Sequence, residues 1–388
     1  MFLKPLMTHE IGSLAKPNWR VKAMNGTAIN DQDVLQAEEW GRKLHIPHAK
    51  ILLDILAKRQ GFTEKDRESV LYFSSLYGIK FFESAGIDLV WDGEQHRVEM
   101  YEYPIRRIGG FQFHGHVRSF DNKYYRKASC EERPSFKEAY HLQEFKLLQQ
   151  LAVKEIKIPV TGAYTLADWS YDAYYFQKVA PGVEHLNEKR FKARSEFLSD
   201  LSTQVVYPNL KALYDAGARY LQIDEPAAMA KRGETSLFIQ SMKESIGDLA
   251  QKLFFSVHIC YSAYSRLFPE IQELEGILDA IHLEYANRDS RNLGRSEKER
   301  TGYAILSDLK KTKFIVGLGV LDIHSDFIEP PSLVRDRILY ACDVIQDPCR
   351  IMVAPDCGLR TRNWDIAYKK LQNMVEGKNL ALQELCRT

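Results

Sequence analysis

The chain has 388 residues, of which 45% are hydrophobic and 27% are charged, and its formal net charge at pH 7 is +1. This composition is ordinary for a soluble globular enzyme, and the charge gives no electrostatic reason to expect nucleic acid or a membrane as a partner. The six cysteines form no CxxC pair, and neither a signal-peptide core nor an apolar run of about 18 residues is present, so we expect a cytoplasmic protein.

Eight short apolar runs recur along the chain, and each ends in a polar or charged cluster. Near-continuous runs of this kind suit parallel strands that are covered on both faces. In chain order they are residues 8–13, 87–94, 157–165, 219–225, 253–260, 278–286, 313–322 and 350–357.

Helical periodicity follows most of these runs. A long helix is predicted over 188–216, with a break near Pro208. Further helices are predicted over 235–249, 331–344 and 364–376. The last of these should end before Gly377. Eight β-then-α units with polar residues at the strand ends predict an α/β protein, a single (β/α)8 TIM barrel over residues 1–388. Its active site should lie at the carboxyl ends of the strands.

Two segments are too long for a barrel connection and are expected to be insertions. After the first strand, a helical insertion over about residues 17–86 carries helices at 31–58 and 63–85. After the second strand, the stretch from about 100 to 134 is rich in Gly, aromatic and basic residues. It should form a loop or hairpin arm near the barrel mouth. A lone GxG at the seventh strand, Gly317 to Gly319, is interpreted as a turn at the barrel rim.

The clearest chemical signal is a group of metal-binding residue types at three strand ends. His258 and Cys260 are two residues apart on one predicted strand, so their side chains face the same way. Glu284 and Cys357 end two later strands, and strand ends converge on one cavity in a barrel. An imidazole, a carboxylate and two thiolates together suit Zn²⁺. The sequence therefore predicts a zinc site; the alternative is that these residues only fill the core.

Two carboxylates and one turn at other strand ends indicate a substrate with charged groups. Asp224, after Gln222 on the same face of its strand, and Glu94 could each accept a substrate ammonium group. The alternatives are a helix N-cap for Asp224 and a plain Asp-Gly turn before Glu94. The turn from Ile11 to Ser13 could hold a carboxylate through backbone amides and the Ser13 hydroxyl, or it could be a simple turn.

Two ring side chains complete the set of candidates. His324 follows the seventh strand and lies next to Asp322, and a histidine near a carboxylate can donate or accept a proton near neutral pH. The alternative is a histidine in a surface loop. Trp169 follows the third strand and could stack on a planar ligand, although a tryptophan is more often part of the core.

These residues lie in segments that resemble the catalytic barrel of the cobalamin-independent methionine synthases, which are zinc-dependent homocysteine methyltransferases. The matching segments, in the family's order from residue 8 to about 377, are EIGSL, DGEQHRVEM, LQIDEPA, HICYS, HLEYANRD, GVLDIHS and APDCGLRTRNW. The chain lacks the separate N-terminal barrel of the long enzymes of this family. It therefore resembles a short core form with the catalytic barrel alone.

The resemblance implies a role for each candidate residue. It implies zinc ligation by His258, Cys260, Glu284 and Cys357. It implies that the carboxylate of homocysteine is held by Ile11 and Ser13, and its ammonium group by Glu94 and Asp224. It also implies that Trp169 stacks on the pterin of polyglutamyl 5-methyltetrahydrofolate, and that His324 is the proton donor to the departing nitrogen.

The chain departs from the long enzymes after DGE. Their loop carries an Arg-Cys-Val-Lys-Pro-Pro-like element associated with the folate, whereas this chain has an unrelated stretch at 113–130, and Asp168 precedes Trp169. A methylcorrinoid protein is therefore an alternative methyl donor. The chain could also be a methyltransferase acting on another thiol such as coenzyme M, a zinc-free decarboxylase of the uroporphyrinogen type, or a non-catalytic zinc accessory subunit. The acidic residues Glu94 and Asp224 favour a substrate with an ammonium group, which coenzyme M lacks.

Overall fold

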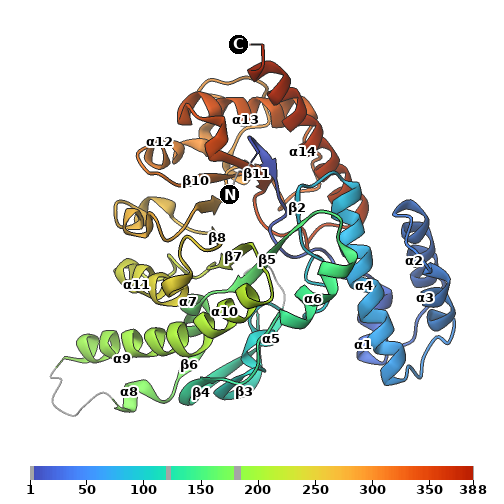
Figure 1. The fold of residues 1–388 in the computed structure, drawn as a ribbon, viewed down its shortest axis with the longest axis horizontal. Helices are drawn as coiled ribbons and strands as arrows, with labels where there is room; N and C mark the ends of the chain where they lie inside the picture. Colours follow the sequence, from blue (N-terminus) through green and yellow to red (C-terminus); the bar gives the residue numbers. More distant parts are fainter. Residues whose placement is uncertain (1–3, 119–123, 179–184, 388) are drawn as a thin grey trace.

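The eight apolar runs form the eight strands of a parallel sheet at the centre of the molecule (Figure 1). The computed structural model describes residues 4–118, 124–178 and 185–387. The strands are β1 (Met7–Thr8), β2 (Leu89–Val90), β5 (Glu155–Thr161), β7 (Tyr220–Asp224), β8 (Phe254–Ile259), β9 (Ala280–Leu283), β10 (Ile315–Leu321) and β11 (Ile351–Pro355). Their order is β1-β11-β10-β9-β8-β7-β5-β2, and a parallel bridge between His9 and Leu89 joins the two ends. The predicted TIM barrel is confirmed.

The interior of the barrel is layered, because every second residue of a strand faces inward. The amino-terminal end of the barrel is closed by an apolar layer of Met7, Leu89, Tyr220, Phe254, Ala280, Ile315 and Met352. The next layer lies two residues further along the same strands, and it consists of His9, Gln222, Ser256 and His282, which are all buried. The buried ammonium group of Lys157 donates to Gln222 Oε1 and to the backbone oxygen of Glu10 in this layer. A polar layer therefore lies directly beneath the carboxyl ends of the strands.

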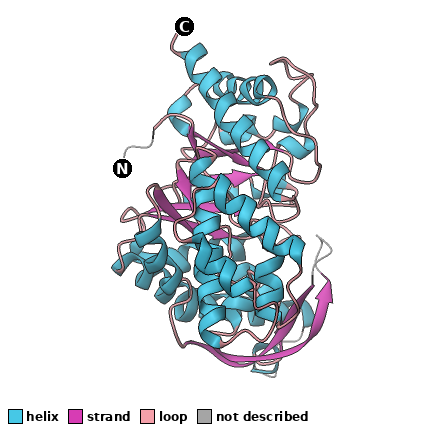
Figure 2. Ribbon diagram, turned by 90° about the vertical axis from the view of Figure 1, so that its right-hand side faces the viewer, coloured by secondary structure: helices cyan, strands magenta, loops and turns pink. Residues whose placement is uncertain are grey.

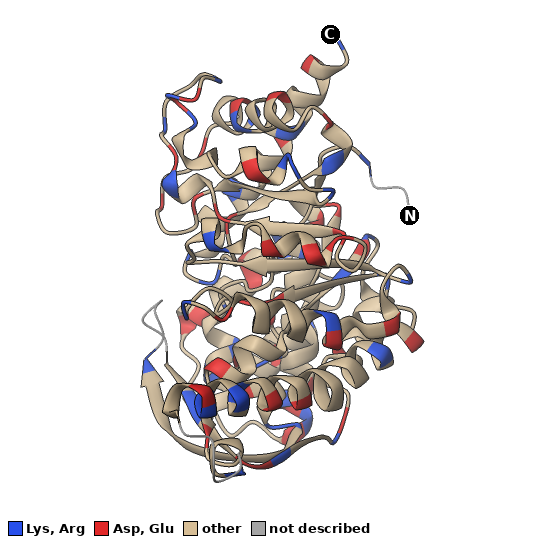
Figure 3. Cartoon of the chain, turned by 90° about the vertical axis from the view of Figure 1, so that its left-hand side faces the viewer, with Lys and Arg blue, Asp and Glu red and all other residues tan. Residues whose placement is uncertain are grey.

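Helices surround the barrel, but the predicted alternation fails once, because the connection between β8 and β9 contains only the 3₁₀ turns Tyr264–Leu267 and Glu270–Leu274. In chain order the helices are α1 (Asn18–Asn25), α2 (Asp31–Lys43), α3 (Ala49–Leu56), α4 (Glu64–Ser84), α5 (Glu102–Ile105), α6 (Leu142–Leu151), α7 (Ala163–Asp168), α8 (Tyr175–Lys178), α9 (Leu186–Leu201), α10 (Tyr207–Asp215), α11 (Thr235–Ile246), α12 (Leu306–Leu309), α13 (Pro331–Ile345) and α14 (Trp364–Leu385). In the part of the chain that the structure describes, no helix has the length and apolar character needed to cross a bilayer. Figure 3 shows acidic and basic residues interspersed over these helices, as the small net charge suggests.

Two helix predictions need correction. The break expected near Pro208 is a π-helical turn, Ser202–Val206, which joins α9 to α10 just before the proline. The last helix does not end before Gly377 but continues to Leu385. Gly377 lies against α13, where a Cβ atom would come within 2.6 Å of Val334 Cβ. This glycine therefore permits two helices to pack closely and does not end a helix.

The first insertion consists of α1 to α4, at the right-hand edge of Figure 1. Asn30 and Thr63 begin α2 and α4, each with a capping box that satisfies free backbone N–H groups of the first turn. The helix expected over 31–58 is interrupted between Lys43 and Ala49, where His45 and His48 have positive φ values of 51° and 56°. The prediction of one continuous helix there was wrong.

The second insertion contains an antiparallel hairpin of β3 (Ile108–Arg118) and β4 (Tyr124–Phe136), which is extended by β6 (Tyr171–Asp172). Residues 119–123 of this predicted arm lie outside the described residues. Figure 2 shows the two long strands running along the lower edge of the molecule. The first residues of β4 reach the barrel mouth, because Tyr125 stacks on Trp169.

Candidate active site

A cavity that is open to solvent lies at the carboxyl ends of the strands. Its walls include most of the residues that the sequence singled out, namely Ile11, Ser13, Glu94, Trp169, Asp224, His258, Cys260 and Cys357. The other two, Glu284 and His324, contact Tyr261 in the cavity wall. The structure therefore gathers all the predicted site residues at one end of the barrel.

Three of the four predicted metal ligands converge to ligand distance. One ligand atom each of His258, Cys260 and Cys357 lies within 4.8 Å of the other two. Nε2 of His258 is 3.4 Å from Sγ of Cys357. His258 is on β8, Cys260 follows the end of that strand, and Cys357 follows β11. The three groups could hold one metal ion between them.

The two thiol groups share one hydrogen bond, and this separates their acidities. The contact with the Cys260 thiol, together with His258, lowers the pKa of Cys357, so this residue is the one that becomes a thiolate first. The same contact and burial raise the pKa of Cys260. A half-buried thiolate beside a buried thiol and a buried imidazole is a donor set suited to a soft or borderline cation.

Glu284, the fourth predicted ligand, lies beside this group but is not part of it. Its Oε2 accepts a hydrogen bond from the backbone N–H of Tyr261 at 2.7 Å, and the Tyr264 hydroxyl is 3.3 Å away. Its Oε1 is 3.4 Å from Nε2 of His324. The buried carboxylate therefore joins the β8 loop to the loop that follows β10.

The ring of His324 is paired with Glu284 and not with Asp322. Asp322 accepts the backbone N–H of His324 at 2.8 Å and the Ser325 hydroxyl at 2.9 Å, so it shapes the loop. The hydrogen bond to Glu284 raises the pKa of His324. The expected carboxylate neighbour exists, but it comes from a different strand end.

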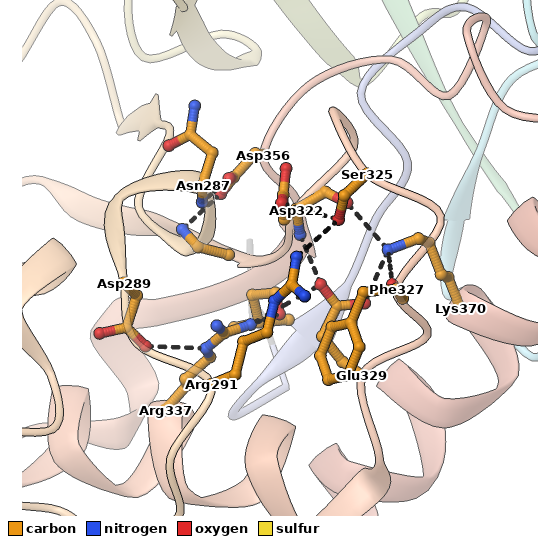
Figure 4. A network of polar contacts seen from close by, with 12 residues as sticks. Asn287, Asp289, Arg291, Asp322, Ser325, Phe327, Glu329, Arg337, Asp356 and Lys370 are labelled. Atoms are coloured by element: carbon orange, nitrogen blue, oxygen red, sulfur yellow. Dashed lines mark hydrogen bonds and ion pairs between the residues drawn. The ribbon is translucent and has the colours of Figure 1, made fainter.

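A buried ion network holds the loop that follows β10 in place (Figure 4). Lys370 of α14 forms an ion pair with Glu329 at 2.8 Å and donates to the backbone oxygens of Asp322 and Phe327. Glu329 in turn accepts the backbone N–H of Asp322 at 2.8 Å. Arg337 of α13 extends the network to Asp289 at 3.0 Å. Because each charge is paired and hydrogen-bonded, burial does not leave any of these partners unsatisfied.

Asp356 connects the end of β11, next to Cys357, to the end of β9, next to Glu284. Its carboxylate accepts the three consecutive backbone N–H groups of residues 285–287 at 2.9, 2.9 and 2.6 Å. The connection passes over β10 at Gly319, where a Cβ atom would overlap Asp356 Oδ1. Gly317 lies in the same strand, and a Cβ atom there would be 2.7 Å from Cδ2 of His282. The interpretation of this GxG as a turn was wrong, since both glycines are inside β10 and make room for side chains of neighbouring strands.

The predicted groups for a charged substrate lie at neighbouring strand ends, and Asp224 on β7 is the register partner of His258 on β8. Asp224 is buried and accepts a hydrogen bond from Gln222 Nε2 at 2.7 Å, and burial raises its pKa to about 6. Glu94 has a positive φ of 61°, a strained conformation for this residue, and its Oε1 is 3.5 Å from the buried guanidinium of Arg97. A Cβ atom at Gly12 would be 2.9 Å from Glu94 Oε1, so the Ile11–Ser13 turn lies against this carboxylate.

Trp169 is half-buried at the mouth, and the arm covers one side of its ring. The centroids of Trp169 and Tyr125 are 5.1 Å apart, with 26° between the planes. Asp168 is ion-paired with Arg194 at 3.2 Å and with Lys231 at 2.9 Å. The negative charge of Asp168, next to Trp169, is thus paired with two positive charges.

Sequence reasoning missed several residues of the site. Glu99, Met100 and Arg360 line the cavity, but they come from loops without a regular pattern. His282 was also missed, although a signal was present, because it is two residues before Glu284 on the same strand face. Its Nδ1 is 2.9 Å from Nδ1 of His258.

Comparisons with known proteins agree on one family. Residues 56–379 match the family model described as the catalytic domain of the cobalamin-independent synthase. The chain is 38% identical over 334 residues to the methionine synthase of Thermoplasma volcanium, covering 83% of this chain and 92% of that protein. It is 31% identical over 388 residues to the methionine synthase of Thermococcus kodakarensis, covering 100% of this chain and 96% of that protein. A B12-independent methionine synthase from Shewanella sp. W3-18-1, solved with selenomethionine, has the same fold, with a TM-score of 0.73, 20% identity, and coverage of 99% of this chain and 100% of that one.

Proposed function

The chain belongs to the cobalamin-independent methionine synthase family and is a methyltransferase of that type, and on this premise we propose that it methylates the thiol of homocysteine with the help of a zinc ion. The observation that carries the proposal is the convergence of His258, Cys260 and Cys357 in a cavity that also presents carboxylates. One group of side chains would hold the metal and the other the amino acid.

The residues present fit a zinc ion. His258, Cys260 and Cys357 supply one nitrogen and two sulfur ligands, a set that zinc accepts and that harder cations do not favour. We assign Glu284 as the fourth ligand through Oε1, since Oε2 is held by the Tyr261 N–H while Oε1 makes only the longer contact with His324. When bound, zinc would keep a substrate thiol deprotonated near neutral pH.

We assign the amino acid end of homocysteine to the carboxylates and the turn that lie beside the metal-binding group. Asp224 and Glu94 would accept its ammonium group, and Arg97 holds Glu94 in place. The backbone at Ile11 and the hydroxyl of Ser13 would hold its carboxylate. Two acidic side chains match the ammonium group and the turn from Ile11 to Ser13 matches the carboxylate, and the side-chain sulfur would then point to the three converging ligands.

We assign the methyl donor to the mouth, with 5-methyltetrahydrofolate, in polyglutamyl form, as the preferred candidate. Trp169 presents a flat ring to the cavity, against which a pterin could stack. His324 would protonate the departing nitrogen, and its Nδ1 is 3.3 Å from the hydroxyl of Tyr261, which lines the cavity.

A comparison of methyl donors tests this function. Purified protein should contain one zinc per chain and form methionine from homocysteine and methyltetrahydrofolate, with a lower KM for the polyglutamyl form. Removal of the metal with a chelator should abolish the activity, and added Zn²⁺ should restore it. Activity with methylcobalamin and none with either folate would overturn the donor assignment. Zinc-free protein with full activity would overturn the metal assignment.

Replacement of Asp224 by Asn should separate amino acid binding from metal binding. We expect the KM for homocysteine to rise about 10- to 100-fold, since a hydrogen bond to a charged group contributes about 1.5–3 kcal/mol. The zinc content should stay at the wild-type value, because Asp224 is not one of the three converging ligands. Steady-state kinetics with metal analysis of the same sample would check this. An unchanged KM, or loss of zinc, would contradict the assigned role.

A further inference from the structure

His258 has a second histidine directly behind it in the barrel wall. His258 on β8 and His282 on β9 are register partners in the parallel sheet, and both side chains are buried. Their Nδ1 atoms are 2.9 Å apart, which is a hydrogen-bond distance. The other nitrogen of His258, Nε2, is on the opposite side of the ring, 3.4 Å from Cys357 Sγ.

This arrangement determines where the hydrogens must be when a metal is held. The nitrogen of His258 that faces the thiol groups is Nε2, and a coordinating nitrogen carries no hydrogen. The hydrogen of the neutral imidazole is then on Nδ1 and points at His282. His282 can accept it only through a bare Nδ1, so its own hydrogen must be on Nε2.

The ring of His282 has little freedom to turn away from this contact. On one side it lies against β10 at Gly317, where a Cβ atom would be 2.7 Å from Cδ2 of His282. His9 packs edge-on against it, with the ring centroids 5.2 Å apart and 88° between the planes. Nε2 of His282 is buried and makes no hydrogen bond with any residue that the structure describes. The contact with His258 is therefore the polar interaction that this ring makes.

We propose that His282 is a positioning residue for the zinc site, which accepts the Nδ1–H of His258 and so fixes the ring orientation and tautomer that present Nε2 to the two thiol groups. The inference rests on the proposed zinc function. Metal-binding histidines usually donate their second N–H to a carboxylate, a backbone oxygen or water. A neutral imidazole in that place adds no negative charge to a donor set that already contains two thiol groups and a carboxylate.

Three substitutions at one position test this inference. His282→Asn keeps an acceptor, because Oδ1 is the same number of bonds from Cα as Nδ1. His282→Gln places its oxygen where Nε2 was, and His282→Leu has no acceptor. We expect the zinc dissociation constant of His282→Asn to stay within about threefold of the wild-type value. Those of His282→Gln and His282→Leu should rise roughly 10- to 100-fold, the usual cost of losing such a partner. Chelator competition on the full chain measures these constants.

Two further readouts distinguish positioning from packing. In cobalt-substituted protein, the visible d–d absorption should match the wild type for Asn and change for Leu, since the spectrum reports ligand geometry. Imidazole ¹⁵N resonances of the zinc form should show His258 protonated at Nδ1. His9→Asn removes a packing contact of the His282 ring but leaves its hydrogen bond to His258, so it should weaken zinc binding by less than about threefold.

The outcomes separate this inference from the proposed function. Wild-type protein that binds no zinc would overturn the zinc function. Wild-type protein that binds zinc, with His282→Leu equal to it in affinity and cobalt spectrum, would overturn the role of His282 alone. If His282→Asn, His282→Leu and His9→Asn all weaken zinc binding equally, and their metal-free forms have a lower Tm, the ring of His282 only fills space. That result would also overturn the positioning role of His282.

Discussion

Replacement of Cys357 or Cys260 by Ser is expected to remove bound zinc and methyl transfer together. Both sulfurs belong to the group whose ligand atoms lie within 4.8 Å of one another, so each variant leaves the metal with an incomplete set. A hydroxyl is a poor replacement, because the thiolate is the form that binds zinc and a serine does not ionise near neutral pH. We expect the loss of affinity to exceed the roughly 10- to 100-fold cost of losing an outer partner.

Metal analysis after dialysis and chelator competition would check this result. Cys349→Ser is the matched control, because Cys349 is an exposed free cysteine remote from the cavity lining. Circular dichroism should show that the site variants keep their fold, since the barrel core does not depend on these two sulfurs. A Cys357→Ser protein with a full complement of zinc would contradict the proposed ligand set.

The barrel was predictable because its strands carry a local signal. Each strand is a short apolar run with a polar end, and burial of both faces of a parallel sheet imposes that pattern wherever the strand lies in the chain. The insertion helices were predictable for a similar reason, through caps such as Thr63 and Asp66. The interruption between α2 and α3 was not predictable, because it depends on two histidines in the left-handed conformation, which residues other than glycine seldom adopt.

Glycines were the main source of error. Gly377, Gly317 and Gly319 were each interpreted as ends or turns, and each makes room for a side chain of another element. The missing Cβ of glycine permits either a positive φ or the close approach of a neighbouring element. The presence of a glycine in the sequence does not show which of the two applies. Only the neighbour across the fold decides, and that neighbour is distant in sequence.

The site shows the same division between local and tertiary information. Strand periodicity brings His258 and Cys260 to one face, and the barrel rule brings Cys357 to the same end. The partner of His324 could not be found in this way, because Asp322 is adjacent in sequence whereas Glu284 reaches the ring from another strand end. The contact of His258 with His282 likewise requires the register of β8 against β9.

Replacement of Gly319 by Ala should damage the metal site without touching a ligand. The new Cβ would overlap Asp356 Oδ1 and would be 3.0 Å from the backbone oxygen of Leu283. Asp356 would have to move, and with it the hydrogen bonds that tie Cys357 to the loop after Glu284. We expect a decrease of about 1–3 kcal/mol in the free energy of unfolding, the range of overpacking, and a zinc affinity at least about tenfold weaker.

A double-mutant cycle identifies the cause of that damage. If the clash is with the carboxylate, Gly319→Ala should cost much less stability in an Asp356→Ala background than in the wild type, because the two changes share one contact. Gly115→Ala in β3 is the control, since no heavy atom lies within 4 Å of its new Cβ. Denaturant unfolding of the metal-free proteins gives the stability, and chelator competition gives the affinity. Additive costs in the cycle would mean that two backbone atoms 3.0 Å from the new Cβ, Leu283 O and Asp356 Cα, receive the strain and the Asp356 carboxylate does not. The carboxylate connection would then not set the distance between Cys357 and Glu284.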